Sequence, residues 1–211
     1  MGEEASGGVR LGGLPRGGWG GAHARWGLAV ALGAACLLAA PVQPARSAGH
    51  AATPAGEPTR GAVEIAGLRL RVPPRAEVTE RALPGGEHVE ARVVAVTRDD
   101  EVLLLTVYRG RRPPKPAKAL ATHLEELDRA LGKVAVPGSL RGRAQRVRLM
   151  GRWARGHALT FRKRVAGREV SWEAGLAAAR RGSVTVVAAW MAPRGPGRFA
   201  PLTVKTASLL P

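Results

Sequence analysis

The sequence predicts an α+β domain in which helices pack on an antiparallel sheet. Most of the chain after residue 61 consists of short apolar segments separated by turn-forming residues, which is typical of strands. Neighbouring segments are joined by tight turns, which implies antiparallel pairing. Two other segments carry apolar residues at helical spacing, so helices are expected to cover the sheet.

The first half of this domain is expected to hold three strands. The first covers residues 63–72 and is interrupted at Gly67. Residues 84–86, Pro-Gly-Gly, form a turn, and a second strand follows over residues 89–97. The third strand, residues 102–108, is almost continuously apolar, which predicts an inner strand of the sheet.

A helix is expected after the third strand, over residues 117–131, and Gly132 would end it. Its apolar stripe has 4-3-4 spacing and consists of Leu120, Leu124, Leu127 and Leu131. Four more strands and a closing helix are expected over residues 145–150, 157–165, 169–179, 183–191 and 199–210. The predicted order is therefore three strands, a helix, four strands and a helix.

The order and hydrophobic spacing of these elements resemble the PsbP-like family, which includes many exported bacterial proteins. The matching pieces are the segments Gly-Leu-Arg-Leu-Arg-Val-Pro at 67–73 and Val-Arg-Leu-Met-Gly at 147–151, the helix between them, the apolar strand at 183–191 and the final helix. The resemblance covers residues 62–210 and implies an α/β/α sandwich with a central antiparallel sheet. It also implies a binding or assembly role, and no functional residue of the family matches a position here.

The N-terminal part predicts export. Residues 26–42 are apolar or small, follow three arginines and precede a Pro/Ala/Ser-rich stretch, as in a secretory signal peptide. The run is shorter than the roughly 20 residues of a membrane-spanning helix, which favours cleavage. The expected organisation is a disordered basic leader (1–25), a signal and cleavage region (26–51), a flexible lead-in (52–61) and one domain (62–211). The expected location is periplasmic or extracellular.

The single cysteine, Cys36, allows a second interpretation of the same segment. A lipid-modified cysteine there would make the protein a membrane-anchored lipoprotein. Against this, Gly33 stands where the lipobox has leucine, and the apolar run continues beyond the cysteine. A chain cleaved after the signal segment would contain no cysteine, which excludes disulfides, thiolate metal sites and a cysteine nucleophile.

The chain is strongly basic, with 33 Lys and Arg against 16 Asp and Glu and a formal net charge of +17. Such a surface attracts phosphates, anionic lipids and acidic polymers. The alternative is compositional bias, because most of the cations are arginines in a chain rich in Ala, Gly and Pro.

Four arginines are the candidate binding residues. Arg146 and Arg148 on one expected strand share outward parity with Arg162 and Arg164 on the next, so the four could form one basic face for an anionic partner. An ordinary solvated face is the alternative interpretation.

The tryptophans give a weaker signal. Trp172 and Trp190 lie in expected strands and should belong to the core. Trp153 is flanked by Arg152 and Arg155 at an expected turn. Its indole could stack on a ligand or pack under the arginine stems.

No catalytic, phosphate-loop or metal-ligand motif is recognisable, and no cofactor is expected. His123 and Glu126 lie three residues apart on one side of the expected helix. They could form one corner of a metal site, but a solvated helix face is the simpler interpretation.

These observations favour an exported, non-catalytic binding or assembly module that contacts a protein partner or an anionic envelope polymer. One alternative is an envelope hydrolase with spatially assembled residues, which would show a polar cluster in a deep pocket. A second is a cytoplasmic nucleic-acid binder, although no specific nucleic acid is expected. Membrane contact is expected only through the signal segment, if that segment is retained or lipidated.

Export with cleavage is directly testable. N-terminal sequencing of the protein recovered from the cell envelope should give a start between about residues 45 and 55. An intact Met1 in a soluble cytoplasmic pool would contradict export. A fatty acid on Cys36 would select the lipoprotein alternative.

Overall fold

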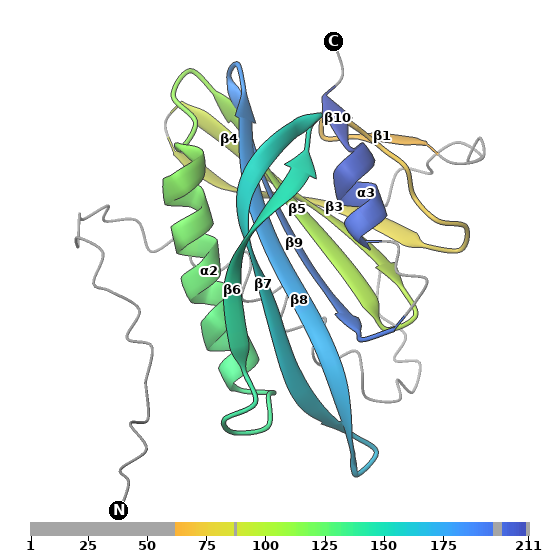
Figure 1. The fold of residues 1–211 in the computed structure, drawn as a ribbon. Helices are drawn as coiled ribbons and strands as arrows, with labels where there is room; N and C mark the ends of the chain where they lie inside the picture. Colours follow the sequence, from red (N-terminus) through yellow and green to blue (C-terminus); the bar gives the residue numbers. More distant parts are fainter. Residues whose placement is uncertain (1–61, 87, 196–199, 210–211) are drawn as a thin grey trace, which may run out of the picture.

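A computed structural model of the chain describes residues 62–86, 88–195 and 200–209 (Figure 1). The expected leader, signal segment and lead-in, residues 1–61, lie outside the described residues, and so does Cys36. No helix in the described ranges is long and apolar enough to cross a bilayer.

The domain is built on one seven-stranded antiparallel sheet. Its strands are β3 (Glu77–Gly86), β4 (Val89–Arg98), β5 (Glu101–Gly110), β6 (Arg141–Leu149), β7 (Arg152–Val165), β8 (Arg168–Arg181) and β9 (Val184–Pro193). They lie in the order β3-β4-β5-β9-β8-β7-β6. The antiparallel pairing expected from the tight turns is therefore present.

The middle of the sheet is the pair β5 and β9, which come from the two halves of the chain. Their register runs from Val102 opposite Met191 to Arg109 opposite Val184. Residues 101–107 and 184–192 are buried without interruption, so both faces of these strands are covered. The inner position predicted from the continuous apolar run of β5 is confirmed, and Trp172 and Trp190 are buried as expected.

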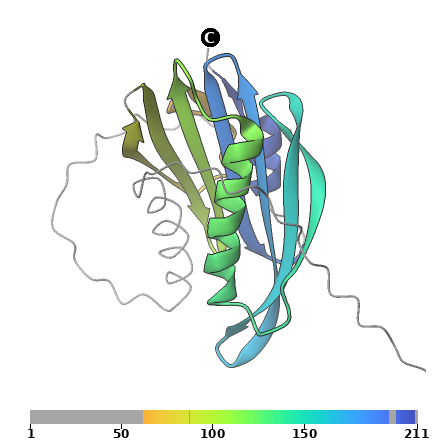
Figure 2. The ribbon, with the colours of Figure 1, turned by 90° about the vertical axis from the view of Figure 1, so that its left-hand side faces the viewer.

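One face of the sheet is covered by helix α2 (Pro116–Gly132), which crosses β7, β8 and β9 (Figure 2). A proline in the first turn suits a helix start, because the missing N–H would have no partner there. Leu127 and Leu131 are fully buried and Leu120 nearly so, whereas Leu124 is only partly buried. The helix and its apolar stripe are thus confirmed, with Leu124 at the margin of the stripe.

The other face carries a short helix and a second sheet. Helix α3 (Ala200–Thr206) packs beside the strands β1 (Val63–Ile65), β2 (Leu68–Leu70) and β10 (Ser208–Leu209), which pair in the order β1-β2-β10. Leu68, Leu70 and Val204 are fully buried here. This layer joins the two ends of the domain, because β10 pairs with β2.

The expected α/β/α sandwich is therefore wrong. Strands dominate the described residues, and the face opposite α2 is covered mainly by the small sheet and the seven-residue α3. The first expected strand, 63–72, folds as a hairpin because Ala66 and Gly67 take left-handed φ angles of 50° and 71° in a tight turn. The expected closing helix, 199–210, stops at Thr206, and the chain then extends as β10.

Strand β3 was not expected from the sequence. It is an outer strand of the large sheet, and its residues 77, 79, 80, 81 and 82 are all exposed. It therefore lacks the apolar alternation that marks a half-buried strand. The expected turn at residues 84–86 lies at the end of this strand, where the register with β4 shifts between Leu83 and Gly86.

The packing of α2 predicts that two leucine-to-alanine variants of this helix lose different amounts of stability. Leu127→Ala should reduce the free energy of unfolding by about 2–5 kcal/mol, because it leaves a cavity in a fully buried site. Leu124→Ala should cost clearly less, because that side chain is partly exposed. Denaturant unfolding of both variants measures this. Equal losses, or losses below about half a kcal/mol at both positions, would contradict the packing described.

Candidate functional site

Three chain connections meet at one end of the large sheet. They are the loop between β5 and α2, the turn between β6 and β7 and the turn between β8 and β9, all at the upper end in Figures 1 and 2. The register explains this, because Arg155 lies opposite Ala178 and Arg109 opposite Val184. The Gly110 N–H also donates to the Ser183 carbonyl at 3.2 Å, which ties the β5–α2 loop to the β8–β9 turn.

This end collects exposed cations from segments far apart in sequence. We call it the basic end and define it by Arg111, Arg112, Lys115, Arg146, Arg148, Arg152, Arg155, Arg180 and Arg181, all exposed. Residues 110–118, 146–155 and 178–183, which form it, contain no Asp or Glu. None of the nine cations makes an ion pair with an acidic side chain of the described residues.

Elsewhere in the described part of the chain, several arginines do have acidic partners. Arg69 lies 2.6 Å from Glu64, and Arg92 lies 2.8 Å from Glu80 and also contacts Glu90. The carboxylates of Glu80 and Glu90 raise the pKa of the Arg92 guanidinium by hydrogen bonding. The basic end differs because its positive charge is not neutralised locally, so it is available to an external anion.

The four arginines proposed from the sequence fall into two separate pairs. Arg146 lies opposite Arg155 and Arg148 opposite Trp153, so this pair belongs to the basic end. Arg162 and Arg164 have the opposite parity on β7, so they are on the other face of that strand. Glu169 binds this second pair.

The oxygens of Glu169 lie 2.8 Å from Arg162 and 3.8 Å from Arg164, at the far end of β7. The structure therefore does not bring the four together on one face. Alternation along a strand shows which residues of that strand share a face. Only the register between two strands shows which residues of both strands share a face, and the sequence alone does not reveal this register. A binding role for each arginine stays a prediction.

Trp153 stands at the start of β7 with 65% of its surface exposed, the one large hydrophobic side chain so exposed in the described residues. The Arg148 guanidinium lies 5.9 Å from the centre of its ring, within the range of a cation–π contact. Arg148 thus packs on the indole, which agrees with the expectation that arginine side chains cover Trp153. Most of the ring nevertheless remains exposed. A ligand could still stack on it.

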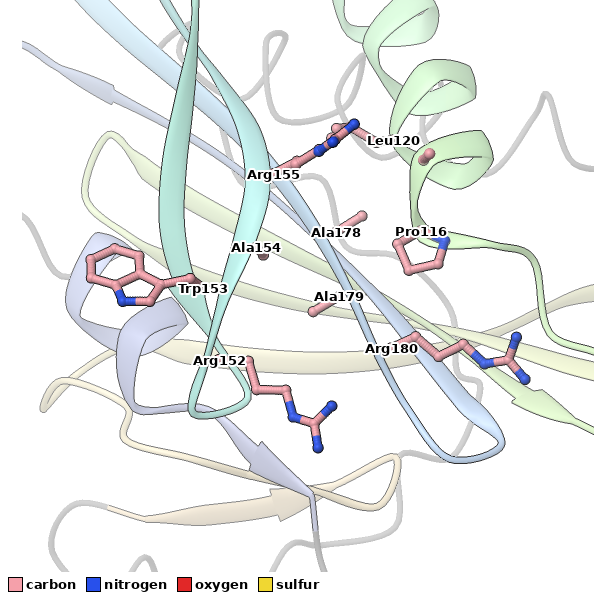
Figure 3. Close-up of a pocket in the computed structure, with 10 residues that line it drawn as sticks. Pro116, Leu120, Arg152, Trp153, Ala154, Arg155, Ala178, Ala179 and Arg180 are labelled. Carbon is pink, nitrogen blue, oxygen red and sulfur yellow. The ribbon is translucent and has the colours of Figure 1, made fainter.

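Beside Trp153 a shallow hollow of about 270 Å³ opens between β7, β8 and the first turn of α2 (Figure 3). Its apolar lining comes from Pro116, Ala117, Leu120, Ala154, Ala178 and Ala179, and its charged lining from Arg152, Arg155 and Arg180. Figure 3 shows Arg155 directed toward Leu120, and Arg152 and Arg180 directed outward. The hollow offers small apolar groups inside and guanidinium groups around them.

The backbone supports this positive surface. Thr185 Oγ1 donates to the Pro114 carbonyl at 2.8 Å and so fixes the β5–α2 loop against β9. The first turn of α2 contains no acidic residue, so the partial positive charge of the helix start is not offset by a neighbouring carboxylate. The Arg180 Nε donates to the Gly182 carbonyl at 2.9 Å, which holds that side chain at its turn.

A second polar cluster lies under α2. The hydroxyl of Tyr108 on β5 is 2.9 Å from His123 Nε2, and His123 Nδ1 is 3.4 Å from Glu126 Oε2. His123 and Glu126 are 3% and 4% exposed, so the solvated helix face expected for them is wrong. Both residues belong to the side of α2 that faces the sheet. This buried side is wider than the leucine stripe, so it also takes in His123 and Glu126.

This cluster has the residue types of an acid–base site. None of its three residues lines the hollow beside Trp153 or the second hollow, at Gly67 and Arg109. In the described ranges no three His, Cys, Asp or Glu side chains gather as metal ligands would. The contact between Tyr108 and His123 ties α2 to β5.

No protein-family model and no curated protein matches the chain. A solved structure from Bacteroides thetaiotaomicron is similar with a TM-score of 0.41 and 12% identity over 71% of this chain, which spans about half (48%) of that protein. LpqN, involved in cell envelope biogenesis of Mycobacterium tuberculosis, is similar with a TM-score of 0.37, 16% identity, and coverage of 68% of this chain and 83% of LpqN. The PsbP-like resemblance therefore gains no family match.

Burial and the nearby Glu126 carboxylate raise the pKa of Tyr108 to about 12. Because Tyr108 is the single tyrosine of the chain, its tyrosinate absorbance can be followed directly. It should titrate near pH 12 in the folded protein and near pH 10 in urea. The raised pKa stabilises the fold below about pH 10, and this contribution is lost as the pH rises toward 12.

The matched control for this titration is Tyr108→Phe. Its free energy of unfolding should fall less steeply than that of the wild type between about pH 10 and 12, because the ionising group is gone. A folded-state titration near the ordinary value of about 10 would show that the hydroxyl is not buried against His123.

Proposed function

We propose that this protein is an exported, non-catalytic binding module whose basic end binds an anionic component of the cell envelope. The observation that carries the proposal is the gathering of nine exposed cations, with no acidic residue in the segments that hold them, around the exposed Trp153. Export is supported by the signal-like order of residues 10–51.

The arrangement argues for binding rather than compositional bias. A bias toward arginine codons adds cations wherever the chain is exposed, but it does not remove acids from three separate segments that the fold brings together. Residues 110–118, 146–155 and 178–183 lie far apart in the sequence and are brought together by strand pairing and by the hydrogen bond between Gly110 and Ser183. Clustered charge of one sign raises the local concentration of anions and repels the protein's own cations, a cost that a bound anion would offset.

The chemistry of the hollow argues against a hydrolase. Its lining consists of Pro, Ala, Leu, Trp and Arg side chains. None of these supplies a nucleophile or a general base at neutral pH, since arginine stays protonated. The Tyr108–His123–Glu126 cluster has suitable groups, but it lines neither this hollow nor the second one.

The proposal predicts that charge reversal at the basic end weakens anion binding selectively. Arg155→Glu with Arg180→Glu should reduce the affinity for soluble polyphosphate by about tenfold or more, and raising the salt concentration should weaken wild-type binding steeply. Both side chains are exposed, so the unfolding midpoint should hardly change. Equilibrium binding at several ionic strengths measures the effect.

The matched control changes net charge equally at the other end of the molecule. Lys133→Glu with Arg168→Glu alters two exposed cations, at the end of α2 and at the start of β8, that have no ion pair with a described acidic side chain. This pair should reduce the affinity by less than about threefold, because charges beyond a Debye length of about 10 Å are screened. Equal losses from both pairs would mean that binding follows net charge alone, and the basic end would then have no special role.

A further inference from the structure

We propose that the anionic component is the surface of an anionic phospholipid bilayer, which the basic end meets with its three connections and with Trp153. This inference rests on the proposed function and names its ligand. It concerns a peripheral contact made by the folded domain, in addition to any contact made by residues 1–61.

The position of Trp153 suits the interface of a bilayer. An indole that is 65% exposed leaves a large apolar surface in water, yet here it stands at the tip of the β6–β7 hairpin among cations. Tryptophan is enriched at membrane interfaces, where its apolar ring lies among the lipid glycerol groups and its N–H stays hydrated. Arg148, held 5.9 Å from the ring centre, would then reach the phosphates at the same depth.

The charges of the basic end are laid out to meet a broad surface. Arg111, Arg112, Arg152 and Arg181 belong to three connections that end together at one side of the molecule (Figures 1 and 2). A bilayer is a broad surface and can engage all three connections at once. The attraction of basic residues to an anionic leaflet falls off within a Debye length, so cations at the tips contribute most. No Asp or Glu in these segments would oppose the approach.

The hollow beside Trp153 combines charged and apolar groups. Arg152, Arg155 and Arg180 present guanidinium forks, which bind phosphate oxygens in pairs. Beneath these forks, Pro116, Ala117 and the largely buried Leu120 and Ala178 form apolar walls. A phospholipid also combines a phosphate with an apolar part, and part of one such molecule could enter the hollow of about 270 Å³.

A bilayer fits this surface better than a soluble polyanion does. A soluble polymer of phosphates would satisfy the arginines but would leave the Trp153 indole exposed to water. An anionic bilayer satisfies both, because it combines a negative surface with an apolar layer beneath it. Charge and apolar surface therefore point to the same ligand.

Vesicle co-sedimentation of the protein, in the form recovered from the cell envelope, tests the inference. Vesicles of phosphatidylglycerol and phosphatidylcholine in equal parts are compared with pure phosphatidylcholine, and soluble polyphosphate serves as the non-membrane anion. We expect binding to the mixed vesicles and at least about tenfold weaker binding to pure phosphatidylcholine. An anchor in residues 1–61 would bind both kinds of vesicle and would be the same in all variants.

Two variants separate the roles of the indole and the charges. Trp153→Ala should weaken binding to the mixed vesicles about tenfold and change polyphosphate binding less than twofold, and Trp153→Phe should recover part of the loss. Arg155→Glu with Arg180→Glu should weaken binding to both ligands. Unfolding midpoints check that each variant is folded, and Lys133→Glu with Arg168→Glu is the charge control.

The possible outcomes distinguish this inference from the proposed function. Binding to polyphosphate without preference for phosphatidylglycerol vesicles would overturn the bilayer inference and leave the proposed function standing. The bilayer inference also fails, and the proposed function again stands, if Trp153→Ala weakens binding to both ligands equally or to neither. Binding to neither ligand would overturn both.

Discussion

The pairing of β5 with β9 is the interaction on which the rest of the structure depends. These two strands lie in the centre of the sheet, are buried on both faces and come from different halves of the chain. Their contact requires a long loop to be closed, and the burial of two continuous apolar runs supplies the free energy that offsets this cost. The remaining strands then add outward on either side through tight hairpins.

The local packing around this pair shows how narrowly it is specified. The Trp190 indole on β9 lies directly against the backbone of Gly175, its register partner on β8, where a Cβ atom would collide with the ring. Gly175 is therefore needed for the indole to lie flat on the sheet. On the other side of β9, Thr185 holds the start of the helical connection through Pro114. The central strands thus determine both the core and the position of the loop that contributes to the basic end.

Much of this fold was accessible from the sequence. The apolar run of β5, the leucine spacing of α2 and the glycine turns of the hairpins are local signals, and each indicated the right element. Strand β3 gave no signal because an exposed outer strand needs no apolar face. The hairpin of β1 and β2 was missed because a break at Gly67 can be either an interruption or a turn, and only the pairing of β1 with β2 decides between them.

The candidate site was less accessible, because it depends on register. The sequence indicated Arg146 and Arg148, and it noted Trp153 with its flanking arginines, but it could not show that residues 111–115 and 180–181 lie beside them. The sequence also grouped Arg162 and Arg164 with Arg146 and Arg148. In the structure, Arg162 and Arg164 lie on the other face of β7 and contact Glu169. His123 and Glu126 were expected to be exposed because their side chains are polar. They are buried because the side of α2 that packs on the sheet is wider than its leucine stripe.

The charges of the outer strands have one further consequence, for the solubility of the folded chain. Within the described residues, β3 and β6 are the two edges of the large sheet, and an open edge can recruit a strand from another molecule. β6 presents Arg141, Arg143, Arg146 and Arg148 along its length, and a second copy adding there would bring like charges together. The arginines near one end of this strand therefore also discourage the edge-to-edge association from which fibrous aggregates grow.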